Sequence, residues 1–216
     1  MVPPVTGPTI LAFDTSAPAC AAALLHNGMV TTRVDEMAKG QAEHLIPMLE
    51  EMLSTAGLHW ADLDGIGVGI GPGNFTGIRI AVSAARGLAL GLGKTAVGVS
   101  TLDALSIDQP NAIACLSAPR DRAYIQANGI AALCNLTPDD MPPYQPKSEP
   151  VLIGNAAEAV ANLIPLQTSD PKMPMITAIA HLAARRLHST TQPPSPLYLR
   201  AADAAPARDA PPVILP

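Results

Sequence analysis

The chain has 216 residues, of which 48% are hydrophobic and 14% charged, and its formal net charge is −5. This length fits one large domain or two small lobes, and the composition is that of a protein with a well-buried core. Strong nucleic-acid binders use a basic surface and stacking rings, but this chain is acidic and only 3% aromatic. We therefore expect no strong tRNA or DNA binding by the isolated chain.

The cysteines and the hydropathy of the chain indicate its cellular compartment. Cys20, Cys115 and Cys134 are far apart in sequence and form no C-x-x-C pair. A sparse, odd set of cysteines favours buried thiols in a reducing compartment. The chain opens without a signal-peptide pattern, and no apolar run reaches the length of about 18 residues that suggests a membrane span. We expect a cytoplasmic protein with no membrane association.

Strands and helices alternate in the predicted order of the first half. Strands are expected at residues 9–13, 19–25, 29–34, 64–70 and 96–99, and helices at residues 41–56 and 78–92. Asn27-Gly28 separates the second and third strands and is the strongest short signal for a hairpin. Ser100 and Asp103 have the spacing of a helix cap. This order predicts an α/β fold with a mixed sheet and crossover helices.

The second half has weaker signals. Strands are expected at residues 112–116, 123–127 and 151–155, a proline-rich loop at 137–150, and a helix at 175–187. We predict two lobes, residues 1–105 and a smaller one at 106–190. Residues 191–216 are rich in Pro and Ala, which predicts a tail that packs back on the fold or is partly disordered.

A glycine-rich turn at residues 69–79 separates a predicted strand from a predicted helix. Such a turn places backbone N–H groups at a helix N-terminus, where an anion or an acidic group can bind. It does not match the dinucleotide pattern G-x-G-x-x-G, because Asn74 stands at the third glycine position. Gly93-Lys94-Thr95 does not make a P-loop either, because Leu88 stands at the first glycine position and the helix precedes the lysine.

Five segments match motifs of a known family in order and spacing. They are residues 10–16 (ILAFDTS), 43–47 (EHLIP), 71–79 (GPGNFTGIR), 98–105 (GVSTLDAL) and 196–200 (PLYLR). Together they resemble the TsaB family, also called YeaZ, which serves threonylcarbamoyladenosine modification of tRNA. The resemblance runs through residue 105, thins, and returns at the tail.

The resemblance implies an actin-like, sugar-kinase-like fold (ASKHA, ribonuclease H-like) of two lobes. It also implies a non-catalytic partner that forms a heterodimer with the paralogous enzyme TsaD, joined by the auxiliary ATPase TsaE. In that complex TsaD transfers threonylcarbamoyl from an adenylate to an adenosine in the tRNA anticodon loop. ATP is used by the wider complex, and no cofactor is implied for the isolated chain.

Two positions depart from the family pattern. The family usually has Ser where this chain has Asn74. It also usually has an Ile-Asp-Ala-Arg run in the second lobe, where this chain has residues 116–120 (LSAPR). Loss of that aspartate near Ser117 argues against a residual site role for the second lobe and does not affect the first-lobe helices.

Asp14 is the candidate for a phosphate site. With Thr15 and Ser16 it follows the first predicted strand, where active actin-like ATPases hold Mg²⁺ or phosphate. Its alternative role is to accept hydrogen bonds within the turn. ATP binding in that fold also needs a second phosphate loop, and no Gly-Gly-Thr-like loop follows residue 105. We expect a vestigial site; the alternative function is a small ATPase or kinase that uses Asp14 and the turn at residues 71–77.

Metal-dependent chemistry has little support in the sequence. The catalytic paralogue binds metal through H-x-x-x-H on a helix, but Gly40 and Met48 stand four residues before and after His44. One histidine cannot build that site. No G-x-S-x-G nucleophile elbow is present either.

The two first-lobe helices are the candidate contact surface. Small residues recur every four positions along the second helix, from Gly77 to Ala89, which permits close approach by another helix. The simpler alternative is that both helices pack only on the protein's own sheet. Ile80, Ala84 and Leu88, however, make the apolar side of the second helix wider than packing on one sheet requires. The predicted interface comprises His44, Leu45, Met48, Leu49, Met52, Asn74, Phe75, Thr76, Gly77, Ile78, Ala81, Val82, Ala85 and Ala89.

Two further predictions follow from this expected interface. Without TsaD, the same helices are expected to form a symmetric homodimer, since an exposed apolar face self-associates. Ala85→Glu or Met48→Asp is expected to abolish complex formation and to leave the fold intact.

Overall fold

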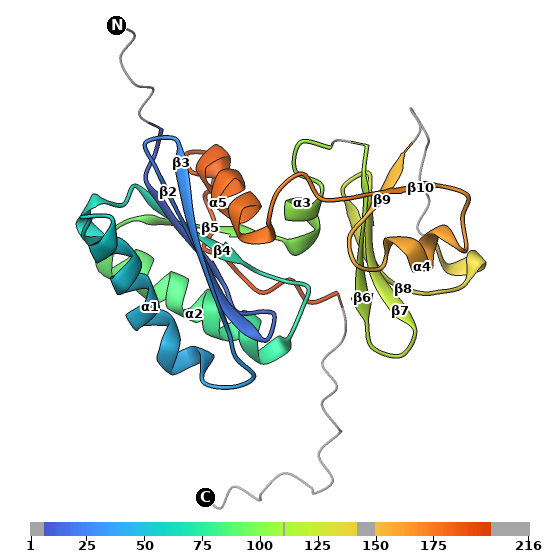
Figure 1. The fold of residues 1–216 in the computed structure, drawn as a ribbon, viewed down its shortest axis with the longest axis horizontal. Helices are drawn as coiled ribbons and strands as arrows, with labels where there is room; N and C mark the ends of the chain where they lie inside the picture. The colour runs from blue at the N-terminus through green and yellow to red at the C-terminus, as the bar shows by residue number, and fades with distance from the viewer. Residues whose placement is uncertain (1–6, 110, 142–149, 200–216) are drawn as a thin grey trace, which may run out of the picture.

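The first of two five-stranded sheets forms the centre of the N-terminal lobe (Figure 1). The computed structural model describes residues 7–109, 111–141 and 150–199. The first sheet has the order β3-β2-β1-β4-β5 and comprises β1 (Ile10–Asp14), β2 (Ala19–His26), β3 (Met29–Glu36), β4 (Gly65–Gly69) and β5 (Thr95–Val99). β1, β2 and β3 are antiparallel neighbours, and β1, β4 and β5 run parallel. The predicted mixed sheet is confirmed.

Helices cover both faces of this sheet (Figure 1). α1 (Gln41–Thr55) and α2 (Phe75–Leu92) pack on one face, and α5 (Met175–Arg186) packs on the other. β1 is buried along its whole length because alternate side chains enter the two cores: Phe13 meets α1 and α2, and Ala12 meets α5. Gly67 permits the close approach of α5, since a Cβ there would lie 2.8 Å from the Cβ of Ala183.

The second sheet has the order β10-β9-β6-β7-β8 and lies beside the first lobe. Its strands are β6 (Ile113–Ala118), β7 (Arg122–Ala127), β8 (Ile130–Asn135), β9 (Val151–Ile153) and β10 (Gln167–Ser169). α4 (Ala157–Ala161) covers one face, and α3 (Thr101–Leu105) lies between the two lobes (Figure 1). Two short 3-10 helices, Trp60–Asp62 and Pro138–Asp140, complete the described elements. The predictions at residues 112–116 and 123–127 are confirmed, but β8, α4 and β10 were missed.

The C-terminal part of the described chain returns to the first lobe. α5 was expected in the lobe at residues 106–190, but it packs on β1, β4 and β2 of the first sheet, which corrects that boundary. After α5, residues 190–199, here called the strap, cross the β5 edge. The backbone N–H of Leu197 donates to the carbonyl of Ile70 at 2.9 Å, and Pro194 lies against Gly98. Residues 200–216 of the predicted tail lie outside the described residues, as do 142–149 of the predicted loop.

Asp103 on α3 ties the lobes together. One carboxylate oxygen accepts a 2.8 Å hydrogen bond from Gln126 on β7, and the other pairs with Arg186 of α5 at 2.9 Å. Ser100 caps α3 by accepting a hydrogen bond from the backbone N–H of Asp103 at 2.9 Å, as its sequence spacing predicted. The two sheets are therefore joined through a side chain as well as through the backbone.

Candidate functional site

Asp14 ends β1 and is 8% exposed. Its carboxylate accepts hydrogen bonds from the backbone N–H of Ser16 at 2.7 Å and from the Ser16 hydroxyl at 2.9 Å. A Cβ on Gly69 would lie 2.5 Å from the Asp14 Cγ, so the neighbouring strand leaves the carboxyl group room only because it has a glycine there. These contacts fit the alternative role for Asp14, in which its carboxylate accepts hydrogen bonds from its own turn.

Burial raises the pKa of Asp14 above its ordinary value, and hydrogen bonds from Ser16 and Thr15 oppose this rise. Desolvation is the largest effect, which means that the folded protein disfavours the charged carboxylate. A Mg²⁺ or phosphate-handling aspartate acts as an anion that faces solvent or a ligand. Asp14 is held instead as a buried group within its own turn.

The turn after β1 closes on the N-terminus of α2. The backbone N–H of Asn74 donates to the Ser16 carbonyl at 2.9 Å, and the Asn74 side chain accepts from the N–H of Gly77 at 2.9 Å. The Thr15 hydroxyl donates to the Gly77 carbonyl at 2.7 Å, and a Cβ on Gly77 would collide with the Thr15 carbonyl. Two backbone donors that a phosphate would need are thus already bonded, which weakens the case for an ATPase.

His44 forms part of a polar cluster at the β3–α1 edge. Its Nε2 lies 2.7 Å from a carboxylate oxygen of Asp35, which also pairs with Arg33 at 2.8 Å. Hydrogen bonds from Arg33 and His44 lower the pKa of Asp35. Within the described ranges, no group of three or more His, Cys, Asp and Glu side chains could hold a metal ion.

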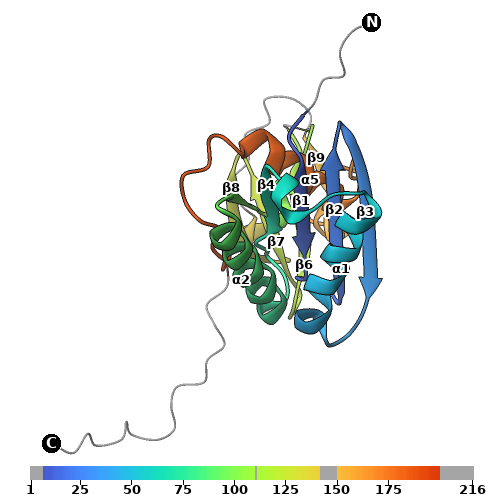
Figure 2. The ribbon, with the colours of Figure 1, turned by 90° about the vertical axis from the view of Figure 1, so that its left-hand side faces the viewer.

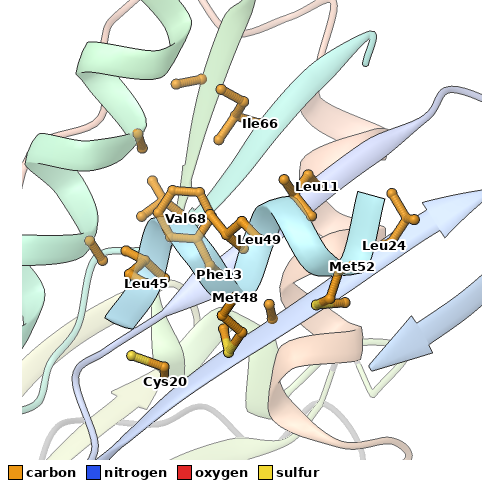
Figure 3. Close-up of a cluster of buried hydrophobic side chains, with 14 of the residues drawn as sticks. Leu11, Phe13, Cys20, Leu24, Leu45, Met48, Leu49, Met52, Ile66 and Val68 are labelled. Carbon is orange, nitrogen blue, oxygen red and sulfur yellow. The ribbon is translucent and has the colours of Figure 1, made fainter. Parts of the chain in front are cut away.

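Most of the predicted interface lies inside the protein's own core. The contact set is corrected at Leu45, Met48, Leu49, Met52, Gly77, Ile78, Ala81, Val82 and Ala85, all of which are buried. Figure 3 shows the α1 side chains of this group gathered with those of β1, β2 and β4. Ala85 is 0% and Met48 1% exposed, so Ala85→Glu and Met48→Asp would place charge in the core and would not leave the fold intact.

The exposed side of the two helices is made of other residues. Ile46 on α1 and Ile80, Ala84 and Leu88 on α2 are half-buried apolar side chains that pack on the edge of the first core. Three exposed positions of α2 are small, namely Ser83, Gly87 and Gly91, whereas Leu90 is a large apolar side chain that is 87% exposed. These seven residues are called the outer helix face: Ile46, Ile80, Ser83, Ala84, Gly87, Leu88 and Gly91.

The composition of α2 does not fit its burial. The helix is apolar and long enough, by length and composition alone, to cross a membrane, yet 28% of its residues are buried in the fold. A Cβ on Gly87 or Gly91 would meet nothing within 4 Å, so neither glycine is required by internal packing. Glycine costs about 1 kcal/mol relative to alanine within a helix. Both features are typical of a helix that an external partner approaches closely.

An aromatic and cationic cluster joins the strap to the start of α2. The Arg79 guanidinium lies 3.8 Å from the centre of the Phe75 ring, and its Nε donates to the Tyr198 hydroxyl at 2.8 Å. The two rings stack with centroids 5.0 Å apart. Phe75 was predicted as a contact residue and is 40% exposed, whereas Tyr198 was missed as a site residue, although the strap motif contains it.

Comparison with known proteins decides the family. The family model for TsaD, tRNA N6-adenosine threonylcarbamoyltransferase, matches residues 35–197. The chain belongs to this family. Two curated relatives are tRNA threonylcarbamoyladenosine biosynthesis proteins TsaB: that of Escherichia coli is 40% identical over 93 residues, and that of Haemophilus influenzae is 38% identical over 99 residues. These segments cover 43% and 45% of this chain and 40% and 42% of those TsaB proteins, so each match spans less than half of either protein.

Longer matches extend the similarity to the second lobe. An uncharacterised protein of Mycobacterium tuberculosis is 32% identical over 201 residues, which is 92% of this chain and 94% of that protein. A crystal structure from Pseudomonas aeruginosa, described as an uncharacterised protein with similarity to peptidase YeaZ, superposes with a TM-score of 0.69 at 26% identity. It covers 89% of this chain and 100% of that one. The relatives and the fold place the chain with TsaB (YeaZ), and the predicted actin-like, two-lobe fold is confirmed.

Proposed function

We propose that the chain is a non-catalytic subunit that binds TsaD and supports threonylcarbamoyladenosine formation in tRNA. The TsaB names of its relatives support a role in that modification. The observation that carries the binding role is the outer helix face, with two glycines that face open space on a helix that is mostly apolar.

TsaD is the partner that fits this face best. The chain matches the TsaD family model across α1 and α2, so TsaD is expected to present an equivalent helix pair. Two such pairs can pack as four helices, and the small outer positions Gly87 and Gly91 allow the backbones to approach closely. Without TsaD, a second copy of the chain offers the same pair and forms a homodimer.

The Asp14 turn supports the proposed non-catalytic role. Its carboxyl group is buried, and the nearby helix N-terminus is capped by Asn74. The chain is therefore proposed to bind no nucleotide by itself, while the wider complex uses ATP through TsaE. The proposed tRNA-modifying role and the three buried free thiols, Cys20, Cys115 and Cys134, support a location in the cytoplasm.

Substitutions on the outer helix face test the binding role. Ala84→Glu places a charge among half-buried apolar residues that can still reach water, and Gly87→Leu adds bulk where the isolated chain has open space. Each variant should lower affinity for TsaD by at least about tenfold, or about 1.4 kcal/mol, in calorimetry. Their circular dichroism should match that of the unmodified chain.

Ala159→Glu is the matched control, because Ala159 is an exposed alanine on α4 in the second lobe. It makes the same chemical change away from the proposed contact and should keep full affinity for TsaD. Unchanged affinity in both Ala84→Glu and Gly87→Leu would rule out this face as the contact.

A further inference from the structure

Positive charge without nearby carboxylates lies along α2 and in the turn after it. Arg79, Arg86 and Lys94 border the strap: Arg79 bonds Tyr198, and the other two line a cavity together with residues 190–194. These three cations are here called the basic flank. No Asp or Glu occurs between Asp64 and Asp103 or within the strap, although the whole chain has a net charge of −5.

The three cations have no acidic partner among the residues that the structure describes. The ion pairs there use Arg33, His44, Arg185 and Arg186 instead. The Arg79 Nε donates a hydrogen bond to the Tyr198 hydroxyl, and this bond holds the guanidinium over the Phe75 ring. The two terminal nitrogens of the guanidinium remain available to a ligand. A fixed, unpaired guanidinium is suited to bidentate binding of a phosphate or carboxylate.

The cavity beside the flank offers further polar groups. It has a volume of about 610 Å³ and lies between the C-terminal half of α2, the start of β5 and the strap. Arg86 and Lys94 line it together with the hydroxyls of Thr190 and Thr191 and the side-chain amide of Gln192. Figure 2 shows the strap running down beside α2, so these groups continue toward the Arg79 cluster.

We propose that the basic flank binds the phosphate backbone of RNA. Three cations along α2 and the turn that follows it can reach several successive phosphates. The Tyr198 ring at one end favours RNA over an acidic protein, because it is 45% exposed and a base can stack on such a ring. The identity of the RNA as tRNA rests on the proposed function.

The flank and the outer helix face can act together. Gly87 of the outer helix face lines the same cavity as Arg86 and Lys94, so the two surfaces adjoin along α2. RNA bound at the basic flank would therefore lie beside TsaD bound at the outer helix face. The flank has few charges, so its contacts are weak alone and add to those of TsaD in the complex.

The test is titration of fluorescent, unmodified tRNA with the full chain, alone and with TsaD, at several salt concentrations. Arg86→Gln/Lys94→Gln should weaken binding about three- to tenfold at low salt and lower the salt slope by about 1 to 2, since each lost phosphate contact removes about 0.7–0.9. Lys39→Gln/Lys172→Gln removes the same charge from exposed positions elsewhere and should change binding less than twofold.

Three results would overturn the proposal. The first is an equal loss in both double variants, which would reflect net charge alone. The second is unchanged tRNA binding with weaker TsaD association, or competition by polyglutamate as strong as by RNA, which would assign the flank to an acidic protein. The third is no salt-dependent tRNA binding up to about 100 µM, with or without TsaD. Titration of the chain alone remains informative if the Ala84→Glu experiment fails, so the two proposals can fail separately.

Discussion

Asp14 stands at a candidate ligand-binding position, yet its contacts are with its own turn. Its carboxyl group lies against Gly69 and is bonded by its own turn, and the facing helix N-terminus is capped by Asn74. Sequence position alone leaves both roles open, because a phosphate-binding aspartate and a turn-accepting aspartate can end the same strand. The three-dimensional closure of the turn at Ser16 on Gly73 and Gly77 separates them.

The stability of the protein should depend on pH through Asp14. Burial raises its pKa in the folded state above the unfolded value of about 3.9. The unfolded chain therefore releases this proton first, and the contribution of Asp14 to stability is full below about pH 3.9 and falls as pH rises through the folded-state pKa. In the Asp14→Asn variant the side chain at position 14 is neutral at every pH, so this pH-dependent loss of stability is absent.

Urea unfolding near pH 4 and pH 7 measures this effect. The free energy of unfolding of the unmodified chain, minus that of Asp14→Asn, should decrease from the lower to the higher pH. A difference that increases with pH would show that the folded state stabilises the charged carboxylate, as a ligand-binding role would require.

At the scale of single elements, α2 combines two kinds of glycine. Gly77 faces inward, and a Cβ there would collide with the Thr15 carbonyl, whereas Gly87 faces open space. Gly77→Ala should cost about 1–3 kcal/mol of unfolding free energy through overpacking. Gly87→Ala should add up to about 1 kcal/mol through helix propensity. Thermal and urea unfolding of the Gly77→Ala and Gly87→Ala variants measure both changes in unfolding free energy. Equal changes in the two variants would contradict the orientation of α2, in which Gly77 is buried and Gly87 is exposed.

The elements predictable from sequence were those with strong local signals. Asn27-Gly28 predicted the β2–β3 hairpin, and both residues have positive φ, at 51° and 77°. Asn128-Gly129 has the same geometry and joins β7 to β8, so the missed strand had a readable signal. Its sequence, IAALCN, has five consecutive apolar residues and so lacks the alternation that marks a half-buried strand. α4 has five residues, too few to show a helical period.

The orientation of α2 could not be predicted because its residues are apolar or small on nearly every side. A stripe from Gly77 to Ala85 and another from Ser83 to Gly91 both repeat every four residues, and only contact with the sheet distinguishes them. The first stripe is buried and the second exposed. Sequence therefore indicated the helix of the candidate site but placed the predicted contact on its buried side.

At the scale of the whole molecule, the chain returns to its first lobe after building the second. α5 and the strap pack on the first sheet and its β5 edge, so the site on α2 uses residues more than 100 positions apart, as in the Arg79–Tyr198 bond. The order of the predicted elements and the family resemblance predicted two lobes, but no local signal assigns α5 to one sheet, because either could bury its apolar face.

The central claim is that this chain is required by TsaD. The most direct measurement is threonylcarbamoyladenosine formation in a mixture of TsaD, TsaE, the adenylate-forming enzyme, ATP, bicarbonate, threonine and tRNA, with this chain omitted, added, or added as Ala84→Glu. We expect product with the unmodified chain and with Ala159→Glu, and little product without the chain or with Ala84→Glu. Equal product with and without the chain would contradict it.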